Sequence, residues 1–493
     1  NDYWIVKINA NGTKQWDSIY GGTSSDRLQI IIPTNDGGYL LGGRSESNTS
    51  GNKTRNTFGG EDYWLVKINA NGTKQWDSIY GGTSSDNLKI ITQTLDGGYF
   101  LGGFSNSNAS GNKTRNTFGQ DDYWLVKIDV NGTKQWDSIY GGSDIEALYS
   151  ITPTNNGGYL LGGHSQSNAG GNKTRNTFGF RDYWLVKINA NGTKQWDSIY
   201  GGTSDDELNT IIPTNDGGYL LGGGSFSTAN GNKTTVSFGN FDYWVVKINA
   251  NGTKINEKGY GGNMIDEVNT MIPTNDGGYL IGGESISGIN GNKTTANFGS
   301  FDYWIVKVAQ KLELSATART TTICAGNTLD IDYSTSCTSL KAGNNLKVEL
   351  SNATGSFASA TTLLTQATVA ASGTLTVTIP ASAAGEFYKI RVSSSSPKDT
   401  VIIGNLFTIV ATAQCSCTDE NTIDWQASFG GTTNDAIDIM IPTSDGGYLL
   451  GGWSQSNAGG NKTRNSFGNY DYWLVKIDAN GTKQWDSIYG GTD

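Results

Sequence analysis

Hydrophobic and polar residues alternate in short runs along most of the chain, and turn residues separate the runs. Four such runs are residues 26–34 (DRLQIIIPT), 39–45 (YLLGGRS), 62–70 (DYWLVKINA) and 73–82 (TKQWDSIYGG). Each run has the length and the β-branched and aromatic residues typical of a strand. None of them has the 3.6-residue periodicity of a helix, so the pattern predicts four strands.

Two tight turns and one long polar loop separate these four runs. The sequence NDGG (residues 35–38) follows the first run, and Asn71–Gly72 follows the third. Asn-Gly between apolar runs is the strongest short-range hairpin signal, and both central residues of a two-residue turn take a positive φ. We therefore expect two hairpins, with Asn71 and Gly72 both at positive φ, joined by the polar loop of residues 46–61.

This four-strand unit repeats at a fixed interval. The tripeptide DYW begins at residues 2, 62, 122, 182, 242 and 302, a period of 60, and again at residue 471. Four antiparallel strands in a repeat of this size are typical of a β-propeller blade. The third and fourth runs occur in seven copies and the first two in six, which predicts six to eight blades, with seven favoured. The uneven ends also suggest a window cut from a longer repetitive chain.

Residues 309–418 interrupt the repeat. Their short alternating runs and frequent turn residues predict an immunoglobulin-like β-sandwich. Blades are expected in residues 1–308 and again in 419–493, in the same ring or the next. The sandwich is therefore either inserted between the third and fourth strands of one blade or placed between two rings, and the fold class is all-β. The candidate disulfide cysteines, whose pairing stays open, are Cys324, Cys337, Cys415 and Cys417.

Composition and charge exclude two classes of partner. The net charge is -10 and no Lys/Arg run is long enough for a nucleic-acid footprint. No segment approaches the roughly 18 apolar residues of a membrane helix, so membrane insertion is not expected.

Two resemblances follow from the motifs. The order YLLGG, DYWLVK and KQW resembles the kelch blade pattern. These repeats, together with LKVELSNATGSFAS and IPASAAGEFYKIRVSSSSP, resemble the very large surface adhesins that gliding-type Gram-negative bacteria export by the type IX secretion system. The resemblance implies an extracellular, outer-membrane-attached protein whose neighbouring repeats belong to one long chain. It also implies candidate O-glycosylation in the short motif DSI, at Ser18, Ser78, Ser138, Ser198 and Ser487.

Catalytic chemistry finds little support in the residues. Kelch-type propellers include a copper radical oxidase that needs a histidine pair and a Tyr–Cys cross-link, but the chain has one histidine, His164, and no cysteine in a blade. A sialidase-like box is matched only in its first half, by residues 443–450 (TSDGGYLL). We therefore predict no enzyme activity, no cofactor and no metal site. A single histidine in such a place is most often a solvated polar residue.

Because the repeats are nearly identical, the positions at which they differ are informative. They vary after Gly-Gly in the second run, just before DYW, and at the start of the first run, and all three places fall on one face of a four-stranded blade. Arginine and aromatic residues gathered on one face are typical of a recognition surface. The candidate ligand-binding residues are Arg44, Phe104, His164, Phe226, Glu284 and Trp453.

The predicted function is that of a non-catalytic cell-surface adhesin or surface-fibre segment, which attaches to glycans or extracellular surfaces at many sites along one chain. Aromatic rings stack on sugars, and the negative charge disfavours polyanions. In the first alternative the varying positions merely tolerate change, and the chain is a structural spacer or filament unit. A glycan-active enzyme is a more distant alternative, which a cluster of inward-facing carboxylates would favour.

Overall fold

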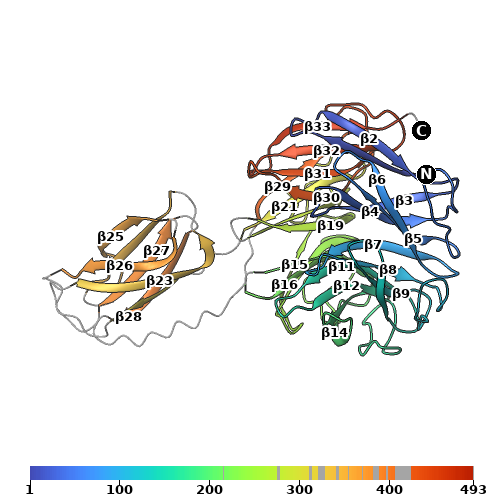
Figure 1. Ribbon diagram of the computed structural model, residues 1–493. Helices are drawn as coiled ribbons and strands as arrows, with labels where there is room; N and C mark the ends of the chain where they lie inside the picture. The colour runs from blue at the N-terminus through green and yellow to red at the C-terminus, as the bar shows by residue number, and fades with distance from the viewer. Residues whose placement is uncertain are drawn as a thin grey trace. The chain divides into compact units, whose positions relative to one another are not determined.

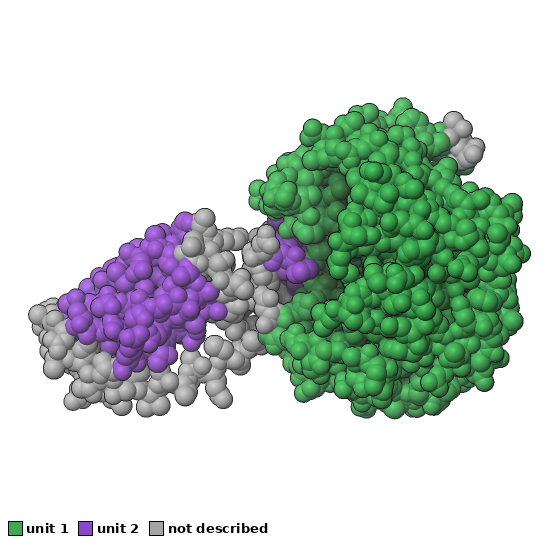
Figure 2. All heavy atoms as spheres, in the orientation of Figure 1, with its two compact units in different colours: residues 1–272, 281–305, 426–493 green, residues 273–280, 306–425 purple. Residues whose placement is uncertain are grey.

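The computed structural model describes residues 1–214, 216–274, 278–309, 314–319, 328–339, 343–352, 355–368, 370–380, 388–395, 398–405 and 423–491. These residues form strands, turns and loops without a helix, which confirms the predicted all-β class. They fall into two compact units, coloured separately in Figure 2. The first unit contains residues 1–272, 281–305 and 426–493, and the second contains residues 273–280 and 306–425.

The repeats form six four-stranded antiparallel sheets, a β-propeller-like fold (Figure 1). We number the strands of each sheet from first to fourth in chain order. The strands of the six sheets are β3 (Asp26–Pro33), β4 (Tyr39–Ser45), β5 (Asp62–Ile68) and β6 (Lys74–Tyr80); β7 (Asp86–Gln93), β8 (Tyr99–Ser105), β9 (Asp122–Ile128) and β10 (Lys134–Tyr140); β11 (Glu146–Pro153), β12 (Tyr159–Ser165), β13 (Asp182–Ile188) and β14 (Lys194–Tyr200); β15 (Asp206–Pro213), β16 (Tyr219–Ser225), β17 (Asp242–Ile248) and β18 (Lys254–Tyr260); β19 (Asp266–Pro273), β20 (Tyr279–Ser285), β21 (Asp302–Val308) and β29 (Ile423–Phe429); and β30 (Asp435–Pro442), β31 (Tyr448–Ser454), β32 (Asp471–Ile477) and β33 (Lys483–Tyr489). A two-stranded sheet, β1 (Tyr3–Ile8) with β2 (Lys14–Tyr20), carries the sequence of a third and a fourth strand.

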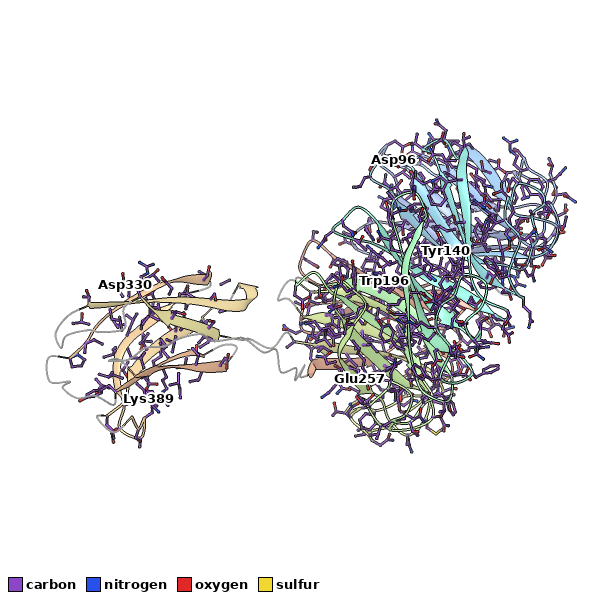
Figure 3. All side chains as sticks on the ribbon, turned by 90° about the horizontal axis from the view of Figure 1, so that it is seen from below. Asp96, Tyr140, Trp196, Glu257, Asp330 and Lys389 are labelled. Carbon is purple, nitrogen blue, oxygen red and sulfur yellow. The ribbon has the colours of Figure 1, made fainter. Side chains whose placement is uncertain are left out.

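The first strands are innermost and the fourth strands outermost. β7 contacts β3 on one side and β11 on the other, and β11 also contacts β15. Figure 1 shows these strands gathered toward the middle of the first unit, with fourth strands such as β14 and β33 at its rim. Figure 3 labels three fourth-strand residues, Tyr140, Trp196 and Glu257. The predicted runs match the observed strands to within two residues at each end.

The Asn-Gly hairpins form, but their geometry differs from the prediction. Gly72 has a φ of 78°. No described residue other than glycine has a positive φ, so the φ of Asn71 is negative. The side-chain oxygen of Asn69 accepts the N–H groups of Asn71 at 3.0 Å and Thr73 at 2.9 Å. Because this side chain closes the turn around Ala70, Asn71 and Gly72, one glycine is enough, and the two-residue turn was wrong.

Tyrosine hydroxyls link successive sheets into a closed circle. The tyrosine of each DYW donates a hydrogen bond of 2.9–3.4 Å to the tryptophan carbonyl of the next DYW. The pairs are Tyr3–Trp64, Tyr63–Trp124, Tyr123–Trp184, Tyr183–Trp244, Tyr243–Trp304, Tyr303–Trp473 and Tyr472–Trp4. The last pair returns to β1, so the two-stranded sheet lies between the sheets β30–β33 and β3–β6.

Apolar packing and buried carboxyls complete the junctions between successive four-stranded sheets. Trp124 packs among residues of its own sheet, such as Leu88, and of the preceding sheet, such as Leu40. At the same junction the carboxyls of Asp62 and Asp86 are buried, and neither Oδ1 has a hydrogen-bond partner. Burial, and then the charge of Asp86, raises the pKa of Asp62 to about 8, although N–H donors oppose the shift. One proton shared by the two carboxyls is therefore expected near neutral pH.

The interruption enters one sheet between its third and fourth strands. β29 is hydrogen-bonded beside β21 in the sheet that β19 and β20 begin. Gln426 of β29 accepts the indole N–H of Trp304 at 3.1 Å, at the position where Asp77 of β6 accepts that of Trp64. Of the two topologies that the sequence allows, this sheet has the inserted one.

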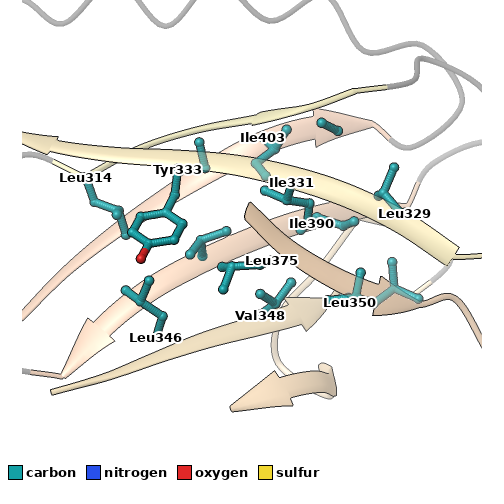
Figure 4. Packing of buried hydrophobic residues seen from close by; sticks show 14 of the residues in the cluster. Leu314, Leu329, Ile331, Tyr333, Leu346, Val348, Leu350, Leu375, Ile390 and Ile403 are labelled. Atoms are coloured by element: carbon teal, nitrogen blue, oxygen red, sulfur yellow. The ribbon is translucent and has the colours of Figure 1, made fainter. Parts of the chain in front are cut away.

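The second unit contains two further sheets, whose residues share one core (Figure 4). The first consists of β22 (Leu314–Ala318), β23 (Thr328–Ser339) and β26 (Ala370–Thr378), and the second of β25 (Thr361–Ala367), β24 (Asn345–Leu350), β27 (Lys389–Ser395) and β28 (Lys398–Asn405). Ile331 and Leu375 of the first sheet pack with Val348 and Ile390 of the second. The immunoglobulin-like assignment stays a prediction.

The candidate disulfides fall outside what the structure describes. Cys324, Cys415 and Cys417 lie outside the described residues, as does the side chain of Cys337 in β23. The described part of the chain contains no helix that could span a membrane.

Candidate functional site

The six candidate residues all lie where the second strands end, beside the start of the innermost strands. Arg44 is paired with Arg27 of the first strand on one side and with Tyr63 of the third on the other. The same register places Phe104, His164 and Trp453 in their own sheets, and Phe226 follows two residues after this position. Antiparallel pairing thus gathers the varying positions of each sheet beside the start of its first strand, as the sequence predicted. We call this place the inner end of the sheet.

Arg44 and Lys89 connect three successive sheets at this end. The Nε atom of Arg44 lies 3.2 Å from a carboxylate oxygen of Glu61, and its guanidinium also donates to Asn87 of the next sheet. The ammonium of Lys89 lies 5.6 Å from the ring centre of Phe104 and 5.5 Å from that of Tyr149. Burial lowers the pKa of Lys89, and the charge of Arg44 lowers it further. Cation–π contacts therefore hold basic and aromatic side chains together.

His164 belongs to this group but is not solvated, so that expectation was wrong. Its side chain is 5% exposed, and its ring centre lies 5.5 Å from that of Tyr149. Burial, together with the charges of Arg181 and Lys89, lowers its pKa to about 3. His164 is thus a neutral side chain packed beside Tyr149, and it has little surface to offer a ligand.

Exposed aromatic rings lie around the same end. Phe180 and Phe226 are exposed, and so is Tyr470, whose ring centre is 5.0 Å from that of Trp453 in an edge-on contact. Arg181 lies over the ring of Phe180 at 5.6 Å and forms an ion pair with Glu207 of the next sheet. The ring centre of Phe226 lies 6.3 Å from that of Phe241, so each of the three exposed rings has a neighbour that limits its motion.

Three neighbouring carboxyls, from β19, β20 and β30, form a group that we call the acidic side. Burial, then the charges of Glu267 and Asp438, raises the pKa of Glu284 to about 8. Burial also raises the pKa of Asp438 to about 6, and burial with the charge of Glu207 raises that of Glu267. Near neutral pH, Glu284 is therefore mostly protonated and Asp438 mostly ionised. Among the residues that the structure describes, no three His, Cys, Asp or Glu side chains are grouped to hold a metal ion.

Sequence reasoning missed the fourth residue of the first strand. This position varies as widely between copies as the chosen ones: Gln29, Lys89, Tyr149, Asn209, Asn269 and Asp438. In β3, β11 and β30 a register shift occurs at this residue. Simple alternation cannot place a residue at a bulge, but its variation between copies could have identified it.

The candidate glycosylation serines are half-buried in fourth strands. The hydroxyl of Ser18 lies beside Gly72 in the turn of the next sheet, and Ser78 lies likewise beside Gly132; a Cβ on either glycine would be 3.1 Å from the serine oxygen. Ser487 lines a cavity of about 550 Å³ with Lys14 and Arg464. Glycosylation at these serines stays a prediction.

Comparisons with known proteins give no family. No protein-family model matches the chain, and a search of curated proteins finds no match. Similar solved structures include a puromycin hydrolase, with a TM-score of 0.32 and 8% identity, over 87% of this chain and 60% of that one. A mutant apocarotenoid oxygenase from Synechocystis has a TM-score of 0.30 and 8% identity over 100% and 93%, and a protein described as a gluconolactonase has 0.30 and 9% over 57% and 74%. Similarity at this level carries no argument about activity.

Proposed function

We propose that the chain is a non-catalytic adhesin or surface-fibre segment that binds glycans, or glycan-bearing surfaces, at the inner ends of its sheets. The observation that supports this proposal is the gathering of the residues that differ between repeats. Six nearly identical sheets bring different side chains to one place, where exposed rings lie beside charged and amide groups.

Binding would use the exposed rings as stacking faces and the polar groups as hydrogen-bond partners. Phe180, Phe226 and Tyr470 offer apolar faces, while Arg44 and Glu61 offer a donor and an acceptor. The junctions hold these groups in fixed places, which lowers the entropy cost of binding. In a longer chain of such repeats, weak sites would act together through their effective concentration. An extracellular location, export by the type IX system and a part in gliding motility belong to this proposal.

The test compares a triple variant with a double variant as its control, in a glycan array and a whole-cell binding assay. The first variant carries Phe180→Ala, Phe226→Ala and Tyr470→Ala, which remove the exposed rings without touching a buried core. The control carries Leu95→Ala and Val130→Ala, two exposed residues in the turns at the opposite ends of the strands.

We expect the first variant to lose binding and the control to keep it, with the thermal midpoints of both unchanged within a few degrees. Binding that survives in both variants would place the ligand elsewhere and contradict the proposal. If the parent protein binds nothing, the structural spacer or filament unit becomes the better explanation.

A glycan-active enzyme is a second candidate, which the carboxyls at the acidic side support. Glu284 and Asp438 have pKa values near 8 and 6, and two carboxyls with pKa values pushed apart can act as acid and base. The assay is release of reducing sugar from a panel of polysaccharides. Release by the parent protein, with a loss of about 100-fold in Glu284→Gln and Asp438→Asn, would replace the adhesin proposal. No release would remove this candidate.

A further inference from the structure

In the part of the chain that the structure describes, no first or second strand joins the two-stranded sheet β1–β2, whereas the other sheets of the circle have both. Elsewhere the third strand is covered on its inner side by the second: Tyr63 to Ile68 of β5 pair with Arg44 to Tyr39 of β4. Within the described residues, β1 is paired only with β2. A strand edge with unpaired backbone groups is a template for another strand.

Apolar side chains on both sides of this edge are more exposed than their counterparts in the other sheets. Ile31 of β3 is 38% exposed, whereas the matching residues Ile91, Ile151 and Ile211 are 3%, 6% and 5% exposed. On the other side, Ile439 and Ile441 of β30 are 49% and 47% exposed. Tyr472 is 40% exposed, while the other DYW tyrosines are fully buried. We call the space bordered by β1, β3 and β30 the open gap.

The repeated junctions show which residues would fill the open gap. At each of them a glycine in the second strand receives an isoleucine or methionine of the next first strand. A Cβ placed on Gly42 would lie 2.4 Å from Ile91, and one on Gly162 would lie 2.3 Å from Ile211. Gly451 of β31 lacks such a neighbour, since the nearest atoms to its Cβ would belong to Leu474 at 3.3 Å and Ile439 at 3.4 Å. The open gap therefore presents a glycine without its isoleucine, Gly451, and an isoleucine without its glycine, Ile31.

We propose that the open gap binds a β-hairpin with the sequence pattern of the repeat's own first and second strands. Its second strand would pair with the free edge of β1, and its glycine would receive Ile31. The first strand of the hairpin would lie on the inner side of its second strand and place an isoleucine or methionine against Gly451. This is strand addition to a sheet edge, in which main-chain hydrogen bonds give affinity and side-chain pockets give specificity.

The test titrates the 493-residue protein with a synthetic peptide of residues 206–225, which contains Ile211 and Gly222 at the two required positions. We expect saturable one-to-one binding by calorimetry and slower hydrogen exchange at the amides of β1. The matched peptide with Gly222→Val would press a branched side chain against Ile31 and should bind at least about tenfold more weakly. A control peptide with Asp216→Asn, changed only in the turn, should bind as the parent peptide does.

A protein variant tests the same contact from the other side. Ile31→Lys alters a residue that is already exposed, so the protein should keep its thermal midpoint and lose peptide affinity by about tenfold or more. Leu95→Lys, in an exposed turn, is its control and should bind normally. Absence of saturable binding at about 1 mM peptide would overturn the proposal. So would equal binding of the Gly222→Val peptide, or a protein dimer that the peptide does not disperse.

Discussion

The junctions between sheets and the inner ends of the same sheets differ in how faithfully one repeat copies another. Tyr63–Trp124 and Tyr183–Trp244 make the same contact, with the same hydrogen bond and ring spacings of 4.7 Å. At the inner ends, the residue after Gly-Gly is Arg, Phe, His, Gly, Glu or Trp. A closed circle needs the same geometry at every junction, so a change there affects closure, whereas a change at an inner end affects only its neighbours.

The largest expected effect comes from a substitution that disrupts a junction. Trp184→Ala removes a fully buried indole that packs with Tyr123 and Leu161 and donates to Asp197 at 3.1 Å. We expect a loss of about 3–5 kcal/mol in the free energy of unfolding, because a large cavity remains and Asp197 loses one of its hydrogen bonds. The matched change at an inner end, Phe226→Ala, removes an exposed ring and should cost less than about 0.5 kcal/mol. Urea unfolding of both variants measures the difference, and similar losses would contradict the comparison.

The second effect is the pH dependence that the junctions bring. The folded-state pKa of Asp62, about 8, lies above its unfolded value of about 3.9, so the folded protein holds the proton more tightly. The stability from this group is fully present below the unfolded pKa and is lost as pH rises toward 8. Asp122, Asp182 and Asp302 have pKa values of about 7 for the same reason, burial first.

We therefore expect the thermal midpoint to fall between pH 5 and pH 8. Asp62→Asn keeps an acceptor for the N–H of Phe58 and adds a donor toward Asp86, without a proton to lose. Over this pH range the free energy of unfolding of the variant should fall less than that of the parent protein, by on the order of 1 kcal/mol. An unchanged slope in Asp62→Asn would show that the carboxyl pair does not share a proton.

The strands and the repeat could be predicted from the sequence, because both rest on local signals. Alternation, the turn residues and the fixed spacing of DYW are visible in the letters alone, and they placed β4 (Tyr39–Ser45) to the residue. The turn geometry could not be predicted the same way, since the side chain of Asn69 replaces a second positive φ.

The gathering of the varying residues could be predicted from the sequence, but their contacts could not. Variation between copies located the inner ends, because pairing in a sheet must bring Arg27, Arg44 and Glu61 together. The burial of His164 depends on Tyr149, which a bulge in the neighbouring strand aims at it, and no pattern in a single run reveals such a contact. Equivalent bulges in β7 and β30 explain why Lys89 and Asp438 were missed.

The smallest effect concerns β18, a fourth strand that lacks the aspartate of strands such as β14. Glu257 stands where β6, β10, β14 and β33 have aspartate. It accepts the N–H of Thr235 at 2.6 Å, but the indole N–H of Trp244 is left without a partner. In the neighbouring sheet Asp197 accepts both the N–H of Thr174 and the indole N–H of Trp184. The shorter aspartate side chain thus accepts hydrogen bonds from both donors. The longer glutamate side chain accepts the backbone N–H but leaves the indole N–H without an acceptor.

Glu257→Asp should therefore raise the free energy of unfolding by about 1 kcal/mol, the usual worth of one buried hydrogen bond. The reciprocal change, Asp197→Glu, should lower it by a similar amount, since it recreates the unpaired indole N–H in another sheet. Urea unfolding gives both values, and the indole proton shift of each tryptophan reports the bond directly. If the two changes do not act in opposite directions, the junctions differ in geometry more than their sequences suggest. The contrast between junctions and inner ends would then rest on the tyrosine hydrogen bonds alone.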